Sequence, residues 1–299
     1  MAAREAFREK IKDILPKELD TDFNLDRWLA NYDNKLDICV EKFQEYINNR
    51  IALGYDKPES LDNFYEREDV KDFCHLFNLS DLRSDWVNEL DNGIVFAEMG
   101  VAEPGKVVKA IRAADYHSIF FGYCEYFQRL IMSLLLPDRV MNRFVFAANY
   151  PDDISNYISA DAIPQGYGGK MVFPETKLPT GCNFHKQISK NDYLNDGEIW
   201  QKFHVSNVRY DIHTVNPGDL YRQNFTVKKG QKFIYEYHAN REFEITCTGP
   251  DGKWILPRFR VSTPVISDEG FVEIKQDGEV NFEIKNLSKL MKMKFKFAV

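Results

Sequence analysis

The sequence has few cysteines and no long apolar run, and each shortage excludes a class of protein. Its five cysteines are an odd number with no close pair among them, so they predict reduced thiols and no disulfide framework. Cys182 and His185 stand near each other, but a structural zinc site needs four ligands, and we expect no metal. No stretch reaches the ~18 uncharged apolar residues that span a bilayer, and the first residues, MAAREAFREK, are charged where a secretory signal is apolar. These shortages favour a cytoplasmic protein.

The chain also lacks the motifs of common enzymes. It contains no Gly-x-Ser-x-Gly elbow, and residues 166–170 (GYGGK) lack both the spaced glycines and the hydroxyl after lysine that a phosphate-binding loop needs. Asp152 and Asp153 are adjacent carboxylates at a predicted helix start, where the helix dipole accounts for them without catalysis. We therefore expect no catalytic residue, no cofactor and no enzymatic activity.

Charge is distributed unevenly along the 299 residues, whose net charge is −7. Residues 200–299 contain 16 Lys and Arg against 12 Asp and Glu, whereas the preceding residues contain 23 against 34. Nucleic acid is disfavoured as a partner, because binding a phosphate backbone requires a dense cationic face. The balance is compatible with weak attraction of the C-terminal region to an acidic membrane, and equally with charges that only keep the protein in solution.

Helical spacing of apolar residues predicts three helices before residue 56. The first covers residues 4–15. Asn24 is the predicted N-cap of the second helix and Asn34 that of the third, which ends near Gly54.

The middle of the chain predicts alternating strands and helices. A turn at residues 91–93 (DNG) precedes a strand at 94–99, and residues 116–136 form a strongly apolar helix. Three polar residues interrupt this helix, so burial against a sheet is favoured over a membrane span. Residues 143–148 (RFVFAA) predict a buried strand, which is followed by a polar helix at 149–159.

The C-terminal hundred residues predict an antiparallel sandwich. Turn signals recur about every ten residues, at Asn216-Pro217-Gly218, Lys228-Lys229-Gly230, Pro250-Asp251-Gly252, Asp268-Glu269-Gly270 and Gln276-Asp277-Gly278. The segment 291–297 alternates strictly, which puts Lys292, Lys294 and Lys296 on one face. This lysine row predicts either protection of a sheet edge or a peripheral contact with anionic lipid or an acidic partner.

Three segments together resemble one known family. Pro164 and the run Tyr167-Gly168-Gly169 stop the polar helix abruptly, and this tripeptide resembles the end of a Sec14-like CRAL-TRIO lipid-binding domain. Residues 22–53 resemble the helical prefix of that family, and residues from 203 onward resemble a GOLD domain, a β-sandwich found at the C-terminus of many relatives.

The resemblance implies an α+β, multidomain fold. We expect an N-terminal helical bundle with a reduced α/β CRAL-TRIO-like domain, followed by an all-β GOLD-like sandwich. The expected domains are the CRAL-TRIO N-terminal helical region at 1–55, a shortened CRAL-TRIO-like domain at 56–172, a linker at 173–201 and the sandwich at 202–299.

Compared with the family that it resembles, this chain lacks a segment in its middle part. In the family, further strands and a gate helix separate the segments matched here by residues 116–132 and 143–148, which are almost adjacent in this chain. Two confident strands remain where sheets average ~5–6, so we expect an incomplete lipid pocket, and a shortened isoform is one explanation. Gln165-Gly166 stand where phosphoinositide-binding members tend to have a lysine, so phosphatidylinositol is not favoured as the ligand.

The implied function is cytosolic lipid binding, with lipid transfer or membrane trafficking as its role and a hydrophobic lipid as the ligand. Tentative lipid contacts, chosen by position alone, lie on the strand at 94–99 and on the apolar helix: Phe96, Glu98, Phe120, Tyr123, Phe127 and Ile131. Core packing explains each of them equally well. The alternative is a non-enzymatic adaptor that binds protein partners through the GOLD-like domain without lipid.

Overall fold

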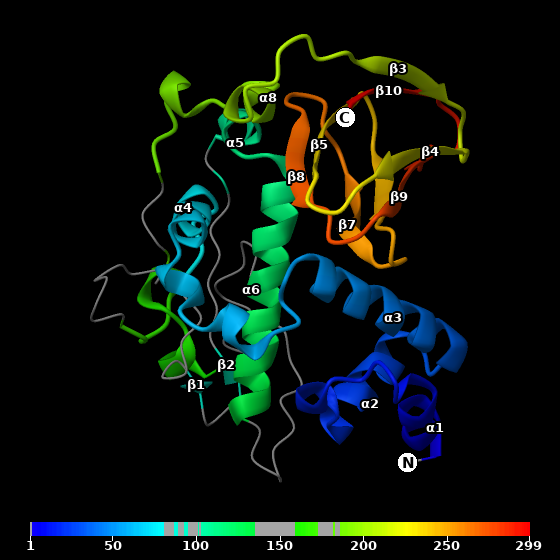
Figure 1. Ribbon diagram of the computed structural model, residues 1–299. Coiled ribbons are helices and arrows are strands. Elements are labelled where there is room, and N and C mark those ends of the chain that lie inside the picture. The colour runs from blue at the N-terminus through cyan, green and yellow to red at the C-terminus, as the bar shows by residue number, and fades with distance from the viewer. Residues whose placement is uncertain are drawn as a thin grey trace. The chain divides into compact units, whose positions relative to one another are not determined.

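The computed structural model describes residues 2–80, 87–88, 93–94, 101, 103–134, 159–172, 182 and 186–299. By its internal contacts the chain divides into two compact units, whose elements are coloured along the chain in Figure 1. The first unit contains Met1–Ser60, Arg112–Ala114 and Leu194–Val299, and the second contains Leu61–Ile111 and Asp115–Tyr193. This division follows contacts and not chain segments, so the four expected domains stay a prediction.

Three helices open the first unit, as expected: α1 (Ala2–Ile11), α2 (Asp22–Asn31) and α3 (Leu36–Ala52). Each contributes apolar side chains from one face to a shared core, in which the ring of Phe7 meets that of Phe43 edge-on at 5.8 Å. Helices this short are marginal alone, so this packing supplies most of their stability.

The ends of these helices differ in part from expectation. Thr21, and not Asn24, caps α2, because the Thr21 hydroxyl accepts the Asn24 backbone N–H at 3.2 Å. Asn24 is one turn inside the helix, where its buried amide donates to the Leu19 carbonyl at 2.9 Å. The end of α3 near Gly54 is confirmed: Gly54 has φ +75°, and the Tyr55 N–H returns to the Arg50 carbonyl as in a Schellman motif.

The C-terminal part of this unit consists of two four-stranded antiparallel sheets, ordered β3-β10-β5-β8 and β4-β9-β6-β7 (Figure 1). The strands are β3 (Asp211–Val215), β4 (Leu220–Val227), β5 (Lys232–Ala239), β6 (Phe243–Thr248), β7 (Trp254–Val261), β8 (Asp268–Glu273), β9 (Gly278–Asn286) and β10 (Met293–Ala298). Their inward side chains form one aromatic-rich core, including Phe243, Phe282 and Phe295. The α+β fold class is confirmed, with a helical region followed by an all-β region of two sheets.

Four of the five expected turns hold a glycine with positive φ: Gly218, Gly230, Gly252 and Gly278. The fifth expectation is wrong. Residues 268–270 belong to β8, where Gly270 pairs with Tyr235 of β5, and a Cβ at Gly270 would overlap the Tyr235 hydroxyl. This glycine therefore marks a close approach inside a sheet.

The strand β10 is not at an edge, because it pairs with β3 on one side and β5 on the other. The strict alternation of the lysine row is confirmed, but the expectation that it protects a sheet edge is wrong. In the other sheet, the edge strand β7 is covered by α3: Asn49 accepts the Arg258 backbone N–H at 2.7 Å, so its amide occupies a ladder position that a further strand would take.

The second unit is mainly helical in the part that the structure describes. It contains the short helices η3 (Phe64–Glu66), α4 (Glu68–Leu76), α5 (Pro104–Ala110) and most of α6 (Ala113–Leu134). β1 (Val87–Asn88) pairs antiparallel with β2 (Gly93–Ile94), so Gly93 of the expected turn belongs to a strand. Residues 95–99 of the expected strand at 94–99 lie outside the described residues. The expected strand at 143–148 lies outside the described residues, as do all but the last residue of the expected helix at 149–159 and residues 173–181 and 183–185 of the expected linker.

Candidate functional site

The tentative lipid contacts on α6 share one stripe of the helix. Phe120, Tyr123, Phe127 and Ile131 recur at intervals of three or four residues, which places them on the same face. Tyr123 and Ile131 are buried, Phe127 is half-buried, and the Phe120 side chain is 43% exposed. The other two tentative contacts, Phe96 and Glu98, lie outside the described residues.

Tyr123 is held in place by the core of the second unit. Its hydroxyl donates to the Ser80 carbonyl at 2.9 Å, and its ring meets the Tyr65 ring edge-on at 6.0 Å. A buried tyrosine with its hydroxyl satisfied is costly to displace. Of the contacts that the structure describes, Phe120 is therefore the one whose ring is open to a ligand.

Phe120 is the exposed end of an aromatic row formed by Phe73, Phe77, Tyr116 and Phe120. The ring centroids of Phe73 and Phe77 lie 4.6 Å apart, those of Phe77 and Tyr116 5.1 Å, and those of Tyr116 and Phe120 5.8 Å. The last pair is parallel within 5°. This aromatic row leads from the fully buried Phe73 of α4 to an exposed ring on α6 and offers a continuous apolar surface.

The segment 164–169, which was predicted to end a helix, folds back on itself within the second unit. Pro164 and Met171 form a parallel bridge, in which the Gln165 N–H donates to the Met171 carbonyl and the Met171 N–H donates to the Ile163 carbonyl. The Gly169 N–H closes the turn by donating to the Pro164 carbonyl. Gly168 has φ +84°, and a Cβ at Gly169 would overlap the Ile163 carbonyl oxygen. Both glycines are thus required, the first for its φ and the second for a close approach that no side chain permits.

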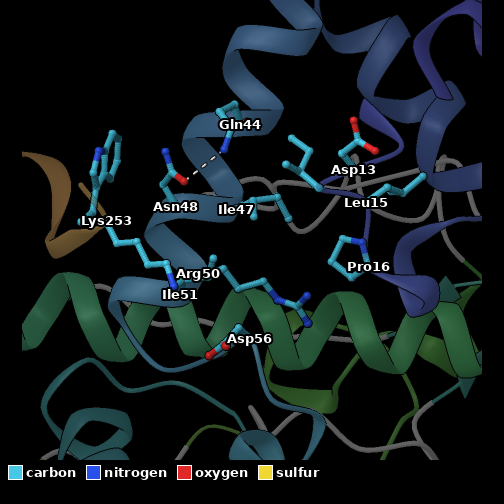
Figure 2. Close-up of a pocket in the computed structure, with 12 residues that line it drawn as sticks. Asp13, Leu15, Pro16, Gln44, Ile47, Asn48, Arg50, Ile51, Asp56 and Lys253 are labelled. Atoms are coloured by element: carbon cyan, nitrogen blue, oxygen red, sulfur yellow. Dashed lines mark hydrogen bonds between the residues drawn. The ribbon is translucent and has the colours of Figure 1, made fainter. Parts of the chain in front are cut away.

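A cavity of about 480 Å³ lies in the first unit (Figure 2). It is lined by the segment after α1, by one face of α3 and by residues near β7: Asp13, Ile14, Leu15, Pro16, Gln44, Ile47, Asn48, Arg50, Ile51, Asp56, Lys253 and Trp254. The volume suits a small molecule. Four ionisable side chains interrupt its aliphatic lining, however, which does not suit a lipid tail, and none of the tentative lipid contacts contributes to it.

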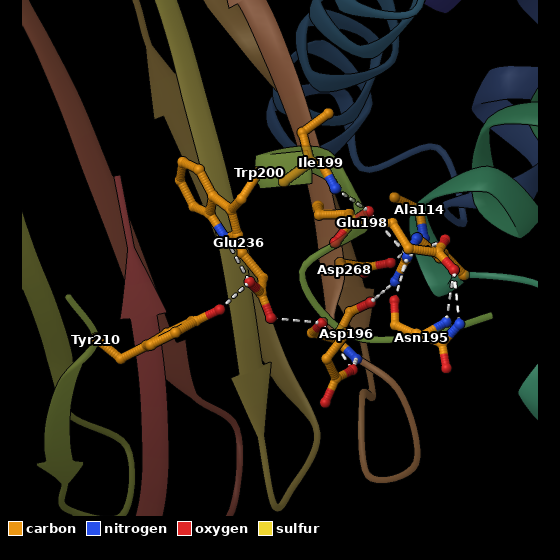
Figure 3. Close-up of polar contacts among 12 residues, drawn as sticks. Ala114, Asn195, Asp196, Glu198, Ile199, Trp200, Tyr210, Glu236 and Asp268 are labelled. Carbon is orange, nitrogen blue, oxygen red and sulfur yellow. Dashed lines mark hydrogen bonds and ion pairs between the residues drawn. The ribbon is translucent and has the colours of Figure 1, made fainter. Parts of the chain in front are cut away.

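Sequence reasoning missed a buried polar network in the first unit (Figure 3). Glu236 of β5 accepts the Trp200 indole N–H at 2.6 Å and the Tyr210 hydroxyl at 2.5 Å on one carboxylate oxygen. Its other oxygen lies 2.8 Å from the Ser267 hydroxyl, which is also 2.9 Å from Asp196. One hydroxyl has one hydrogen, so Ser267 donates to one of these carboxylates at a time.

Arg112 continues this network. Its guanidinium lies between two carboxylates, at 3.1 Å from Glu198 and 2.9 Å from Glu269, and it also donates to the Ser267 carbonyl at 2.6 Å. Burial raises the pKa of the Glu269 carboxyl, and the Arg112 charge opposes that shift only in part.

The acidic side chains at the centre of this network accept hydrogen bonds from donors on other segments, and in this way they hold those segments together. Across the residues that the structure describes, no group of three or more His, Cys, Asp or Glu side chains is placed to hold a metal ion. Within the same residues, no helix has both the length and the apolarity to cross a bilayer.

Two solved structures give only weak similarity to this fold. A de novo designed double-stranded β-helix has a TM-score of 0.22 and 22% identity, covering 30% of this chain and 96% of its own. A family GH115 4-O-methyl-alpha-glucuronidase has a TM-score of 0.20 and 12% identity, covering 91% of this chain and 40% of its own. At these TM-scores neither carries an argument. No model of a known protein family matches the chain.

A curated protein matches along the full chain. A CRAL-TRIO domain-containing protein of Caenorhabditis elegans is 19% identical over 377 residues, which cover 100% of this chain and 94% of that protein. The alignment runs over 377 residues, whereas this chain has 299. The difference is what we expect if this chain lacks a segment that the relative has. The match confirms the resemblance seen in the closing motif and the helical prefix, and the two four-stranded sheets are consistent with a GOLD-like sandwich. Along its full length, the chain is therefore similar to a CRAL-TRIO domain-containing protein.

Proposed function

We propose that this protein binds a hydrophobic lipid in the cytosol without reacting with it, and that it serves lipid transfer or membrane trafficking. The observation that carries the proposal is the full-length similarity to a CRAL-TRIO domain-containing protein. The closing motif with its two required glycines and the aromatic row ending at Phe120 support it. The ligand contacts proposed are the six chosen from the sequence, with Phe120 as the first to test.

The lipid site is proposed to be reduced. Covering an acyl chain of ~16 carbons is worth more than about 10 kcal/mol, at ~0.8 kcal/mol per CH₂, only when the chain is enclosed on all sides. In the described part of the second unit, the β-structure is limited to one antiparallel pair of two-residue strands and one isolated bridge. A single-chain lipid or one acyl tail, with the head group in water, fits such a surface better than a whole phospholipid.

Native mass spectrometry of the purified protein tests this function. We expect a co-purifying lipid of one acyl chain, and a reduced lipid-bound fraction for Phe120→Asp. The matched control is Ile38→Asp on α3, because Ile38 is 40% exposed, close to the 43% of Phe120, and lies in the other unit. Bare wild-type protein that also moves no lipid between vesicles contradicts the proposal.

A second candidate, the adaptor without lipid, is favoured by exposed apolar side chains on the C-terminal sandwich. Ile212 lies on the edge strand β3 and is 71% exposed, and Leu290 and Met291 precede β10 and are also exposed. An edge strand with an outward isoleucine can extend its sheet with a partner's strand. Saturable partner binding by lipid-free protein, lost in Ile212→Lys, supports this candidate against the first.

The peripheral membrane contact suggested by the lysine row also stays a proposal. Lys292 and Lys294 are exposed, but the Lys296 ammonium lies 3.8 Å from the centre of the Tyr210 ring. The row thus offers two free-standing cations at most, which makes it a weak membrane anchor.

A further inference from the structure

A second group of lysines surrounds two phenylalanine rings at the opposite end of the same sheet. The rings of Phe203 and Phe271 meet edge-on with centroids 4.9 Å apart. The ammonium of Lys232 lies 5.0 Å from the Phe203 ring centre and 5.9 Å from that of Phe271. The ammonium of Lys202 lies 5.9 Å and 5.5 Å from the same two centres. Two cations therefore flank one aromatic pair.

Three more lysines belong to the same end of the sandwich. Lys228 and Lys229 form the turn before β5, and Lys275 follows β8. The turn is joined to the end of β8, because the Gly230 N–H donates to the Ile274 carbonyl and the Ile274 N–H donates to the Gln231 carbonyl. We call the five lysines Lys202, Lys228, Lys229, Lys232 and Lys275, together with Phe203 and Phe271, the lysine–phenylalanine patch.

The lysine–phenylalanine patch is exposed and cationic. All five lysines are exposed, and the Phe271 side chain is 39% exposed. Two carboxylates lie beside these lysines: Glu273, opposite Lys232 in the β5–β8 pairing, and Asp277, which accepts the Lys229 N–H at 2.7 Å. Glu198 and Glu269, on the same helix and strand as the patch, pair with Arg112 instead. Five lysines against these two acids form a local excess of positive charge, whereas the charges of residues 200–299 are otherwise close to balanced.

We propose that the lysine–phenylalanine patch docks the protein on a bilayer that contains anionic phospholipid. Lysines near such a surface each raise the partition coefficient by about fivefold, and they act together when they face it at once. An aromatic ring between them enters the interface, where amphipathic contacts are favourable. Exposed cations suit the anionic head groups of such a bilayer, and the exposed ring between them suits the interface below those head groups. This docking does not depend on whether the protein also holds a lipid of its own.

The lysine row serves as an internal control for this proposal. Lys294 lies beside Asn240, just beyond one end of β5, whereas Lys232 begins the other end. Eight strand residues separate the two lysines by roughly 25 Å, at ~3.3 Å per residue. That distance exceeds the Debye length of about 8 Å at physiological salt, so charge changes at one end do not substitute for changes at the other.

Co-sedimentation with vesicles tests the proposal on the full chain. The probes are phosphatidylcholine vesicles with and without phosphatidylserine, at physiological salt. We expect the wild type to bind only the vesicles that contain phosphatidylserine, and Lys202→Glu/Lys232→Glu to lower that binding by more than ~25-fold, since two lysines are lost at about fivefold each. Phe271→Ser is expected to weaken binding to the same vesicles with its lysines intact.

The matched comparison, Lys292→Glu/Lys294→Glu, makes the same charge change at the other end of β5 and is expected to lower binding much less than Lys202→Glu/Lys232→Glu does. The proposal would be overturned if both double variants lost the same amount of vesicle binding. It would also be overturned if the wild type bound vesicles equally well with and without phosphatidylserine. So would binding unaffected by the patch variants, or capture of an acidic protein in place of vesicles. Circular dichroism confirms that each variant is folded. Because the readout is vesicle binding, failure here leaves the lipid-retention measurement by mass spectrometry unchanged.

Discussion

Trp200 donates its indole N–H to the carboxylate of Glu236 at 2.6 Å, and Glu236 is only 1% exposed (Figure 3). Trp200 lies in the short helix α8 (Glu198–Lys202), and Glu236 lies on the face of β5 that points away from the sandwich core. The same oxygen accepts the Tyr210 hydroxyl, so one carboxylate fastens two separate segments onto the outer face of the sheet.

Replacing Glu236 with Ala removes the acceptor and leaves buried donors on Trp200 and Tyr210 unpaired. We expect the free energy of unfolding to fall by about 3 kcal/mol, because each buried unsatisfied donor costs ~1–3 kcal/mol. Urea denaturation followed by tryptophan fluorescence measures the change. Glu279→Ala, which alters an exposed carboxylate on β9, is the control and should stay within ~0.5 kcal/mol. A loss at Glu236 no larger than at Glu279 contradicts this account.

Arg112→Met tests the buried ion pairs. The change leaves the Glu269 carboxylate buried without its counter-charge, and removing one partner of a buried pair costs about 3–5 kcal/mol. Thermal and chemical unfolding measure the loss. Arg222→Met on β4 is the control, since Arg222 pairs with Glu283 on an exposed surface and should cost at most ~1 kcal/mol. Adding Glu269→Gln to Arg112→Met should restore part of the lost stability, and failure to do so argues against the charge explanation.

The pH dependence of stability tests the environment of Glu269. Its pKa is raised above the usual value of 4.5 because burial penalises the carboxylate. A carboxyl whose pKa is higher in the folded state binds its proton more tightly there, so its ionisation costs stability as pH rises from 4.5 through the raised value. Relative to Glu269→Gln, we expect the wild type to lose stability over that window. A wild type that instead gains stability over this range would show that the charge of Arg112 outweighs burial.

Gly169→Ala tests the closing motif. The added methyl group meets the Ile163 carbonyl, so the bridge between Pro164 and Met171 must open or shift, at a cost of about 1–3 kcal/mol. Hydrogen exchange at the Met171 amide, which donates to Ile163, reports the opening. Gly105→Ala in α5 is the control with the opposite sign, because nothing lies near its added methyl and alanine favours a helix. Unchanged protection at Met171 contradicts the steric argument.

Local patterns predicted most of the regular structure. The alternation of residues 291–297 placed β10 correctly, and helical spacing placed α3 with its end at Gly54. The same patterns do not reveal pairing partners, so Lys296 was expected at an edge although β10 is an inner strand. A glycine does not by itself distinguish a turn from a close approach, and this is why Gly270 was expected in a turn.

The candidate site was less predictable. Phe120 could be placed on the apolar face of α6 by spacing, but its exposure depends on how Tyr116 packs against Phe77, the residue after α4, and spacing does not reveal that packing. The network of Arg112 and Glu236 joins residues more than a hundred positions apart through single contacts, and no local pattern signals such a connection.

The order of the strands has a consequence for synthesis on the ribosome. β3 and β5 appear early in the nascent sandwich, yet β10, the strand that lies between them, begins 78 residues after β3 ends, at Met293 against Val215. Until then both leave open backbone donors and acceptors, which other nascent chains can pair with. Chaperone protection, or a slow final step in which β10 inserts between its neighbours, is therefore the expected biogenesis of this protein.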